Sequence, residues 1–122
     1  MRKSFTVILL LLVAACMGQT GEIGFYYFVE LIPTEESMGF GKPQLDSIQQ
    51  VHLQNIRDMA VAKQLVLAGP FKQGGGILIL KAADLEAAQM LVEKDPAVSA
   101  GRFSYTIREW YTERSMFTLE SN

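Results

Sequence analysis

Residues 44–68 read QLDSIQQVHLQNIRDMAVAKQLVLA, and most of this stretch has the periodicity of one amphipathic helix. At about 100° per residue, one face collects the apolar side chains Leu45, Ile48, Ile56, Met59 and Ala62. His52, the only histidine of the chain, lies at the centre of that face. A titratable ring within an apolar stripe is an inconsistency of the kind that concentrates at functional sites. His52 is therefore the first candidate for a functional residue.

The segments around this helix have the composition of β-strands and of one further helix. Apolar runs rich in β-branched and aromatic residues predict strands at 25–32, 65–71, 76–81 and 102–112. The Gly69-Pro70 pair predicts that the second strand lies at a sheet edge, because proline cannot donate to a central ladder. A second helix is expected at 84–94, with Asp84 as its N-cap and Asp95-Pro96 as its end.

The resulting order β-α-β-β-α-β predicts an α+β, ferredoxin-like fold. In this fold a four-stranded antiparallel sheet carries two helices on one face. Since no further helix is available for the other face, which receives aromatic residues, a homodimer packed sheet against sheet is expected. Residues 34–42 and 97–101 are expected to be connections, and the first helix is expected to end near Lys63 or Gln64.

The first residues predict an export signal. Arg2 and Lys3 precede an apolar run at 5–15, which has the length of a secretory signal core and is shorter than the ~20 residues of a membrane span. The run ends in residues 13–16 (VAAC), which are similar to the lipobox of bacterial lipoproteins. We interpret 1–16 as a signal whose Cys16 becomes lipidated and anchors the protein to a membrane, facing the periplasm or the cell exterior. Ordinary cleavage near the same position, giving a soluble exported protein, is the alternative.

The rest of the chain is expected to form one domain. Residues 17–24 are glycine-rich and polar and predict a tether, 25–112 form the domain, and 113–122 form a polar tail. Because the chain has one cysteine, no internal disulfide is available and burial of apolar surface must stabilise the domain.

Composition and charge argue against several classes of function. The chain has 13 acidic and 11 basic residues, a formal net charge of −2 and no basic patch, so nucleic acid is not an expected partner. One histidine and one cysteine provide no zinc site, and no phosphate-binding loop follows a strand. The serines at 47, 99 and 104 lie in no nucleophile-elbow context. No metal and no cofactor are therefore expected.

Several short motifs resemble those of the YCII-related family. They lie at 52–53 (HL), 55–56 (NI), 67–71 (LAGPF), 75–77 (GGI), 86–88 (EAA), 95–101 (DPAVSAG) and 108–111 (REWY). The resemblance implies a dimeric α+β-barrel fold and a cleft in which His52 and Asp95 approach each other, with Gly69, Pro70 and Phe71 as pocket residues. It also implies a small organic molecule as ligand, since relatives on this fold process small cyclic or chlorinated aromatic compounds.

A histidine and an aspartate in one cleft support general acid–base chemistry, because the carboxylate orients the imidazole and stabilises its protonated form. From composition alone, purely structural roles are favoured for His52 and Asp95, since buried polar groups are usually just hydrogen-bonded. The resemblance favours the shared cleft. Two function classes remain: a cofactor-free lyase or isomerase that uses His52 and Asp95 as acid and base on a small organic molecule, and a non-catalytic, membrane-tethered dimer that binds a ligand or a partner protein. A solvent-reachable polar pocket that both side chains face would favour the enzyme, whereas a closed apolar cleft with His52 bonded only to backbone would favour the binding module.

Overall fold

Residues 21–117 are described in the computed structural model of this chain, and their elements occur in the predicted β-α-β-β-α-β order. The strands are β1 (Ile23–Pro33), β2 (Leu65–Pro70), β3 (Gly76–Leu80) and β4 (Phe103–Glu113). The helices are α2 (Lys42–Val61), α3 (Leu85–Glu93) and α4 (Pro96–Ser99), with short 3-10 helices η1 (Glu36–Gly39) and η2 (Arg114–Phe117). Residues 25–111 form a unit of their own, separate from the residues that flank them.

The predicted signal segment at 1–16, its Cys16, and residues 17–20 of the predicted tether lie outside the described residues, as do residues 118–122 of the predicted tail. None of the helices within residues 21–117 is long and apolar enough to cross a bilayer. Export and lipidation stay predictions.

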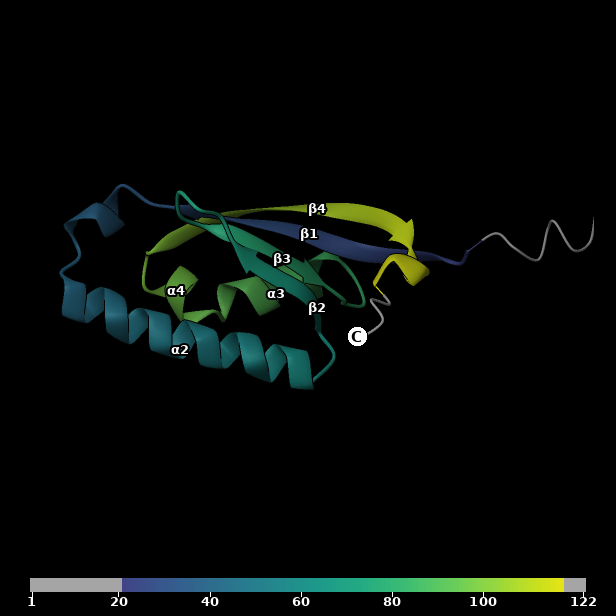
Figure 1. The fold of residues 1–122 in the computed structure, drawn as a ribbon, viewed down its shortest axis with the longest axis horizontal. Helices are drawn as coiled ribbons and strands as arrows, with labels where there is room; N and C mark the ends of the chain where they lie inside the picture. The colour runs from purple at the N-terminus through teal and green to yellow at the C-terminus, as the bar shows by residue number, and fades with distance from the viewer. Residues whose placement is uncertain (1–20, 118–122) are drawn as a thin grey trace, which may run out of the picture. The chain divides into compact units, whose positions relative to one another are not determined.

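The four strands form one antiparallel sheet in the order β2-β3-β1-β4, and the helices lie on one of its faces (Figure 1). Val29 of β1 lies opposite Leu78 of β3, and Gly69 of β2 lies opposite Ile77. The predicted α+β, ferredoxin-like fold class is thereby confirmed. β2 is an edge strand, as its Gly-Pro pair predicts.

Helix α2 packs its apolar face against the rest of the fold. It starts directly after Gly41 with a proline in its first turn, where the missing N–H donor costs nothing. Ile48 and Met59 are buried, at 8% and 4% exposure. The helix ends at Val61, earlier than predicted, and Lys63 turns the chain away with φ of 58°. Ala62, predicted on the buried face, is exposed because it lies beyond the last helical turn.

The connection predicted at 97–101 is wrong in part, because Pro96–Ser99 form the short helix α4. The Asp95 side chain accepts a hydrogen bond from the Ala97 backbone N–H and caps this helix, while Pro96 occupies its first turn. Gly101 has φ of 79°, a left-handed conformation that leads the chain from α4 into β4. The Asp-Pro pair therefore both ends α3 and starts α4. The loop predicted at 34–42 likewise contains η1.

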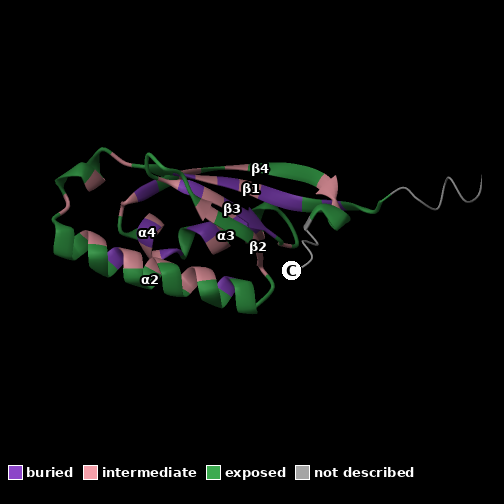
Figure 2. Ribbon diagram, in the orientation of Figure 1, coloured by how far each residue is buried: buried purple, intermediate pink, exposed green. Residues whose placement is uncertain are grey.

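The core lies between the helices and one face of the sheet (Figure 2). Val29 from β1, Leu80 from β3 and Val92 from α3 have no exposed surface. On the opposite face, the ring of Trp110 lies edge-to-face with Phe28, with centroids 6.2 Å apart. No helix within residues 21–117 covers this second face.

Candidate functional site

The site is built around a buried carboxylate at the start of α4. Asp95 has no exposed surface, and its Oδ1 accepts a hydrogen bond of 2.8 Å from the Ala97 N–H. Local sequence explains this placement, since aspartate is a preferred N-cap and proline a preferred first helical residue. The cap uses only part of the hydrogen-bonding capacity of the carboxylate.

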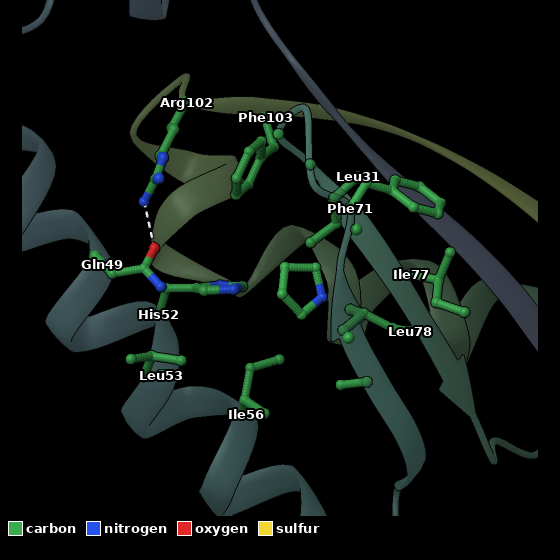
Figure 3. Close-up of a pocket in the computed structure, with 16 residues that line it drawn as sticks. Leu31, Gln49, His52, Leu53, Ile56, Phe71, Ile77, Leu78, Arg102 and Phe103 are labelled. Atoms are coloured by element: carbon green, nitrogen blue, oxygen red, sulfur yellow. Dashed lines mark hydrogen bonds between the residues drawn. The ribbon is translucent and has the colours of Figure 1, made fainter.

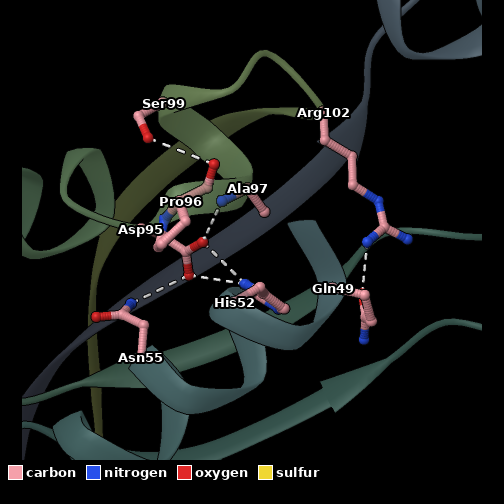
Figure 4. Close-up of polar contacts among 8 residues, drawn as sticks. All are labelled: Gln49, His52, Asn55, Asp95, Pro96, Ala97, Ser99 and Arg102. Carbon is pink, nitrogen blue, oxygen red and sulfur yellow. Dashed lines mark hydrogen bonds and ion pairs between the residues drawn. The ribbon is translucent and has the colours of Figure 1, made fainter. Parts of the chain in front are cut away.

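The remaining capacity of Asp95 is used by two side chains from α2 (Figure 4). The Nδ1 of His52 lies 2.9 Å from Oδ1 and 2.8 Å from Oδ2 of Asp95. The Nδ2 of Asn55 donates to Oδ2 at 3.2 Å. His52 and Asn55 are three residues apart on a helix and therefore share one face. A single buried carboxylate thus joins α2 to α4.

These contacts determine which nitrogen of His52 faces away from Asp95. An ionised carboxylate only accepts hydrogen bonds, and the Asn55 amide and the Ala97 N–H already donate to this one. We therefore assign the ring proton to Nδ1, which leaves the lone pair on Nε2. The Phe103 ring packs on the imidazole, with centroids 6.0 Å apart. The imidazole is thus held in one orientation with Nε2 available for chemistry.

The imidazole borders a cavity of about 300 Å³ between α2 and the β2–β3 hairpin (Figure 3). Its α2 wall consists of Gln49, His52, Leu53 and Ile56, which share one helix face. The predicted pocket residues Gly69, Pro70 and Phe71 line the opposite side, and Phe103 lies at one end. The His52 side chain is 12% exposed. The candidate site is therefore an open pocket that His52 borders, and His52 is hydrogen-bonded to the Asp95 side chain. The expectation that Asp95 also faces the pocket is wrong, because this carboxylate is fully buried behind His52 and does not line the cavity.

Sequence reasoning missed four residues of the site. Asn55 belongs to one of the short sequence motifs, and its spacing of three from His52 places it on the same helix face. Gln49 has the same spacing on the other side of His52 and also lines the pocket. Arg102 and Phe103 carried no signal, because their approach to α2 depends on how α4 leads into β4.

Among residues 21–117, no three histidine, cysteine, aspartate or glutamate side chains gather in a way that could hold a metal ion. Within the same residues, every buried side-chain nitrogen and oxygen has a hydrogen-bond partner.

Comparison with known proteins places the chain in a family. A sequence model of the YCII-related domain matches residues 26–111. The chain belongs to the YCII-related family. The match begins within β1 and ends within β4, so it spans nearly all of the ferredoxin-like unit, and it confirms the resemblance seen in the sequence motifs.

Two known proteins are similar to this YCII-related chain. The uncharacterized protein YjpA of Bacillus subtilis (strain 168) is 33% identical over 60 residues, which cover 48% of this chain and 71% of YjpA. The structure of 5-chloro-2-hydroxyhydroquinone dehydrochlorinase (TftG) from Burkholderia phenoliruptrix AC1100, in complex with 2,5-dihydroxybenzoquinone, superimposes with a TM-score of 0.56. The superposition covers 70% of this chain and 92% of TftG at 19% identity, and it shows a shared fold.

The YCII-related domain offers two aspartate N-caps that differ in their partners, and this difference is testable. Asp95→Asn should lower the free energy of unfolding by about 1–3 kcal/mol, because an amide cannot accept from three donors and would turn its own NH₂ toward one of them. Asp84→Asn should change it by less than about 0.5 kcal/mol, because Asp84 caps α3 through one hydrogen bond, from the Ala87 N–H, and asparagine caps equally well. Urea unfolding of both variants measures the difference. Equal losses would contradict the assigned network.

Proposed function

We propose that this chain is an enzyme that moves a proton on a small organic molecule, with His52 as the general base and acid. The observation that carries the proposal is the orientation of His52. Its Nδ1 is held by the buried Asp95, and its ring borders an open pocket. The reaction class that fits is elimination or isomerisation without a cofactor.

The pair supplies what such a reaction needs. The Asp95 carboxylate keeps the imidazole in one tautomer and stabilises the imidazolium that forms when Nε2 accepts a proton. A positioned general base contributes on the order of 10²–10⁴-fold in rate. This is sufficient for an activated substrate, in which the departing proton or leaving group is already labile. Asp95 does not face the pocket and acts through His52 as a positioning residue.

The structural neighbour suggests which compounds to try first. TftG is a dehydrochlorinase of 5-chloro-2-hydroxyhydroquinone and was solved with 2,5-dihydroxybenzoquinone. In an elimination of this type here, His52 Nε2 would take the proton and chloride would leave with the electrons of the C–Cl bond, so that HCl is lost overall. The pocket of about 300 Å³ has the size of a small-molecule site.

His52→Gln should lower kcat by about 10²–10⁴-fold, because glutamine can still donate to Asp95 but cannot exchange a proton. The assay is chloride release from 5-chloro-2-hydroxyhydroquinone and from a panel of haloaromatics, with ring opening or isomerisation of small lactones followed in parallel. Gln54→Ala is the matched control, since Gln54 lies on the same helix and bonds only Asp58, away from the pocket.

Equal rates for wild type and His52→Gln would refute the assignment of the base. No turnover with any compound of the panel, together with tight binding of one of them, would instead support the non-catalytic binding module.

We also propose that two chains pack their open sheet faces together. The support is the apolar character of that face, where Leu67 pairs with Ile79 and is 49% exposed. Leu67→Glu should halve the molar mass measured by light scattering, because a buried carboxylate at such an interface is unpaired. Leu85→Glu is the control, since Leu85 is also exposed, at 40%, but begins α3 on the helical side. A wild-type protein with the mass of one chain would exclude the dimer.

We further propose that the chain is exported and anchored through lipidated Cys16. The support is the basic start of the chain, the apolar run and the small residues before the cysteine. Several acyl chains on one residue give stable anchoring, whereas one chain is marginal. Cys16→Ser should abolish incorporation of labelled palmitate in a bacterial host and release the protein from the membrane fraction. Incorporation equal to that of wild type would refute lipidation at Cys16.

A further inference from the structure

The charge on the pocket lining differs in sign from that of the whole chain. The chain has a formal net charge of −2. Of the residues that line the pocket, none is an aspartate, a glutamate or a lysine, and Arg102 is the one permanently charged side chain. The surface that a ligand would contact is therefore mostly apolar and carries one positive charge, while the nearest carboxylate, Asp95, is buried behind His52 and accepts hydrogen bonds there. Such a lining is suited to an anionic ligand.

Arg102 is oriented by two uncharged partners, Gln49 and Phe103 (Figure 3). One guanidinium nitrogen, Nη1, donates to Oε1 of Gln49, and Cζ lies 4.9 Å from the centre of the Phe103 ring. Gln49 thus holds the guanidinium over the aromatic ring without neutralising its charge. These contacts account for one of the five N–H donors of the side chain.

No carboxylate within residues 21–117 forms an ion pair with Arg102. Glu36 lies beside Gly101, with Oε2 3.0 Å from the position that a Cβ there would occupy, yet it does not pair with the arginine. A half-buried guanidinium with free donors and no counter-ion is suited to a ligand that brings its own negative charge.

The backbone of Arg102 is held by the same short helix that carries Asp95. The Arg102 N–H donates to the Ala97 carbonyl at 3.0 Å, and the Arg102 carbonyl accepts from the Thr34 N–H at 3.1 Å. Ala97 is also the residue whose N–H is bound by Asp95. One turn of helix therefore sets the positions of both Arg102 and Asp95, the carboxylate partner of His52.

We propose that Arg102 is the anion-binding residue of this pocket and that its ligands are small cyclic molecules bearing a carboxylate or an ionised phenol or enol. The guanidinium binds the oxyanion, and the apolar walls with the Phe103 ring contact the carbon skeleton. As a statement about substrates, this inference rests on the proposed function of the same site. As a statement about binding, it is measurable without turnover.

The inference is tested with two quinones of similar shape and different charge. 2,5-Dihydroxybenzoquinone has acidic enol groups and is an anion in neutral water, whereas 2,5-dimethoxybenzoquinone is neutral. Calorimetric titration of the full chain should give at least about tenfold tighter binding of the anion, equivalent to ~1.4 kcal/mol. Added salt should weaken binding of the anion and leave the neutral compound unaffected.

Arg102→Gln should remove this preference and weaken binding of the anion about tenfold or more. Arg102→Lys should retain part of the preference, because lysine keeps a point charge. Arg108→Gln is the matched control. Arg108 lies on β4, which begins directly after Arg102, and its Cζ lies 5.5 Å from the centre of a phenylalanine ring, that of Phe28, but it does not line the pocket. Thermal unfolding midpoints of all three variants show whether a loss of binding is merely a loss of folding. If Arg102→Gln does not fold, the affinity of Arg102→Lys for the anion still tests the inference.

Three results would overturn the inference: no binding of the anion by wild type, equal binding of the two quinones, or equal affinity in wild type and folded Arg102→Gln. Its failure is distinct from failure of the proposed function. Anion binding through Arg102 without turnover would refute the enzyme and keep the binding site. Turnover that depends on His52 but not on Arg102 would refute the anion-binding role of Arg102 and keep the enzyme.

Discussion

The interaction on which this site depends is the hydrogen bonding of the Asp95 carboxylate. It is fully buried and accepts from the Ala97 backbone, the Asn55 amide and the His52 ring. A buried charge is tolerated only when it is hydrogen-bonded, so each of the three donors is needed for stability as well as for geometry. The same contacts cap α4, attach it to α2 and orient the imidazole. Structural and functional demands are met by one side chain.

The two polar side chains of the pocket, His52 and Arg102, are both held by contacts with helix α4. His52 is held through Asp95 at the N-terminus of α4, and Arg102 is held through the Ala97 carbonyl of the same helix. The hairpin residues Gly69 and Pro70 supply an apolar wall facing them. Both groups are thus attached to one turn of helix, His52 through the Asp95 side chain and Arg102 through its backbone N–H. Such preorganisation reduces the cost of ordering groups around a ligand.

The glycines of the hairpin show how tightly this wall is packed. A Cβ on Gly76 would lie 2.5 Å from the Gly69 carbonyl oxygen, and a Cβ on Gly75 would lie 2.2 Å from the Leu31 carbonyl oxygen. Backbone atoms cannot move aside as a flexible side chain can. Gly75 and Gly76 are therefore required for the start of β3 to approach the backbones of β1 and β2 beside the pocket.

The sequence by itself determined the element order, the edge position of β2, the Asp84 cap and the family, because periodicity, proline geometry and capping are local properties of a chain. It also singled out His52 and Asp95, whose roles as proton-transfer residue and positioning residue stay proposals. Only the tertiary structure decided that these two residues, 43 positions apart, share a hydrogen bond and that Arg102 enters their pocket. Such proximity depends on how α2 packs on the sheet and how α4 turns into β4. Residue type and spacing within one segment do not encode the distance between segments.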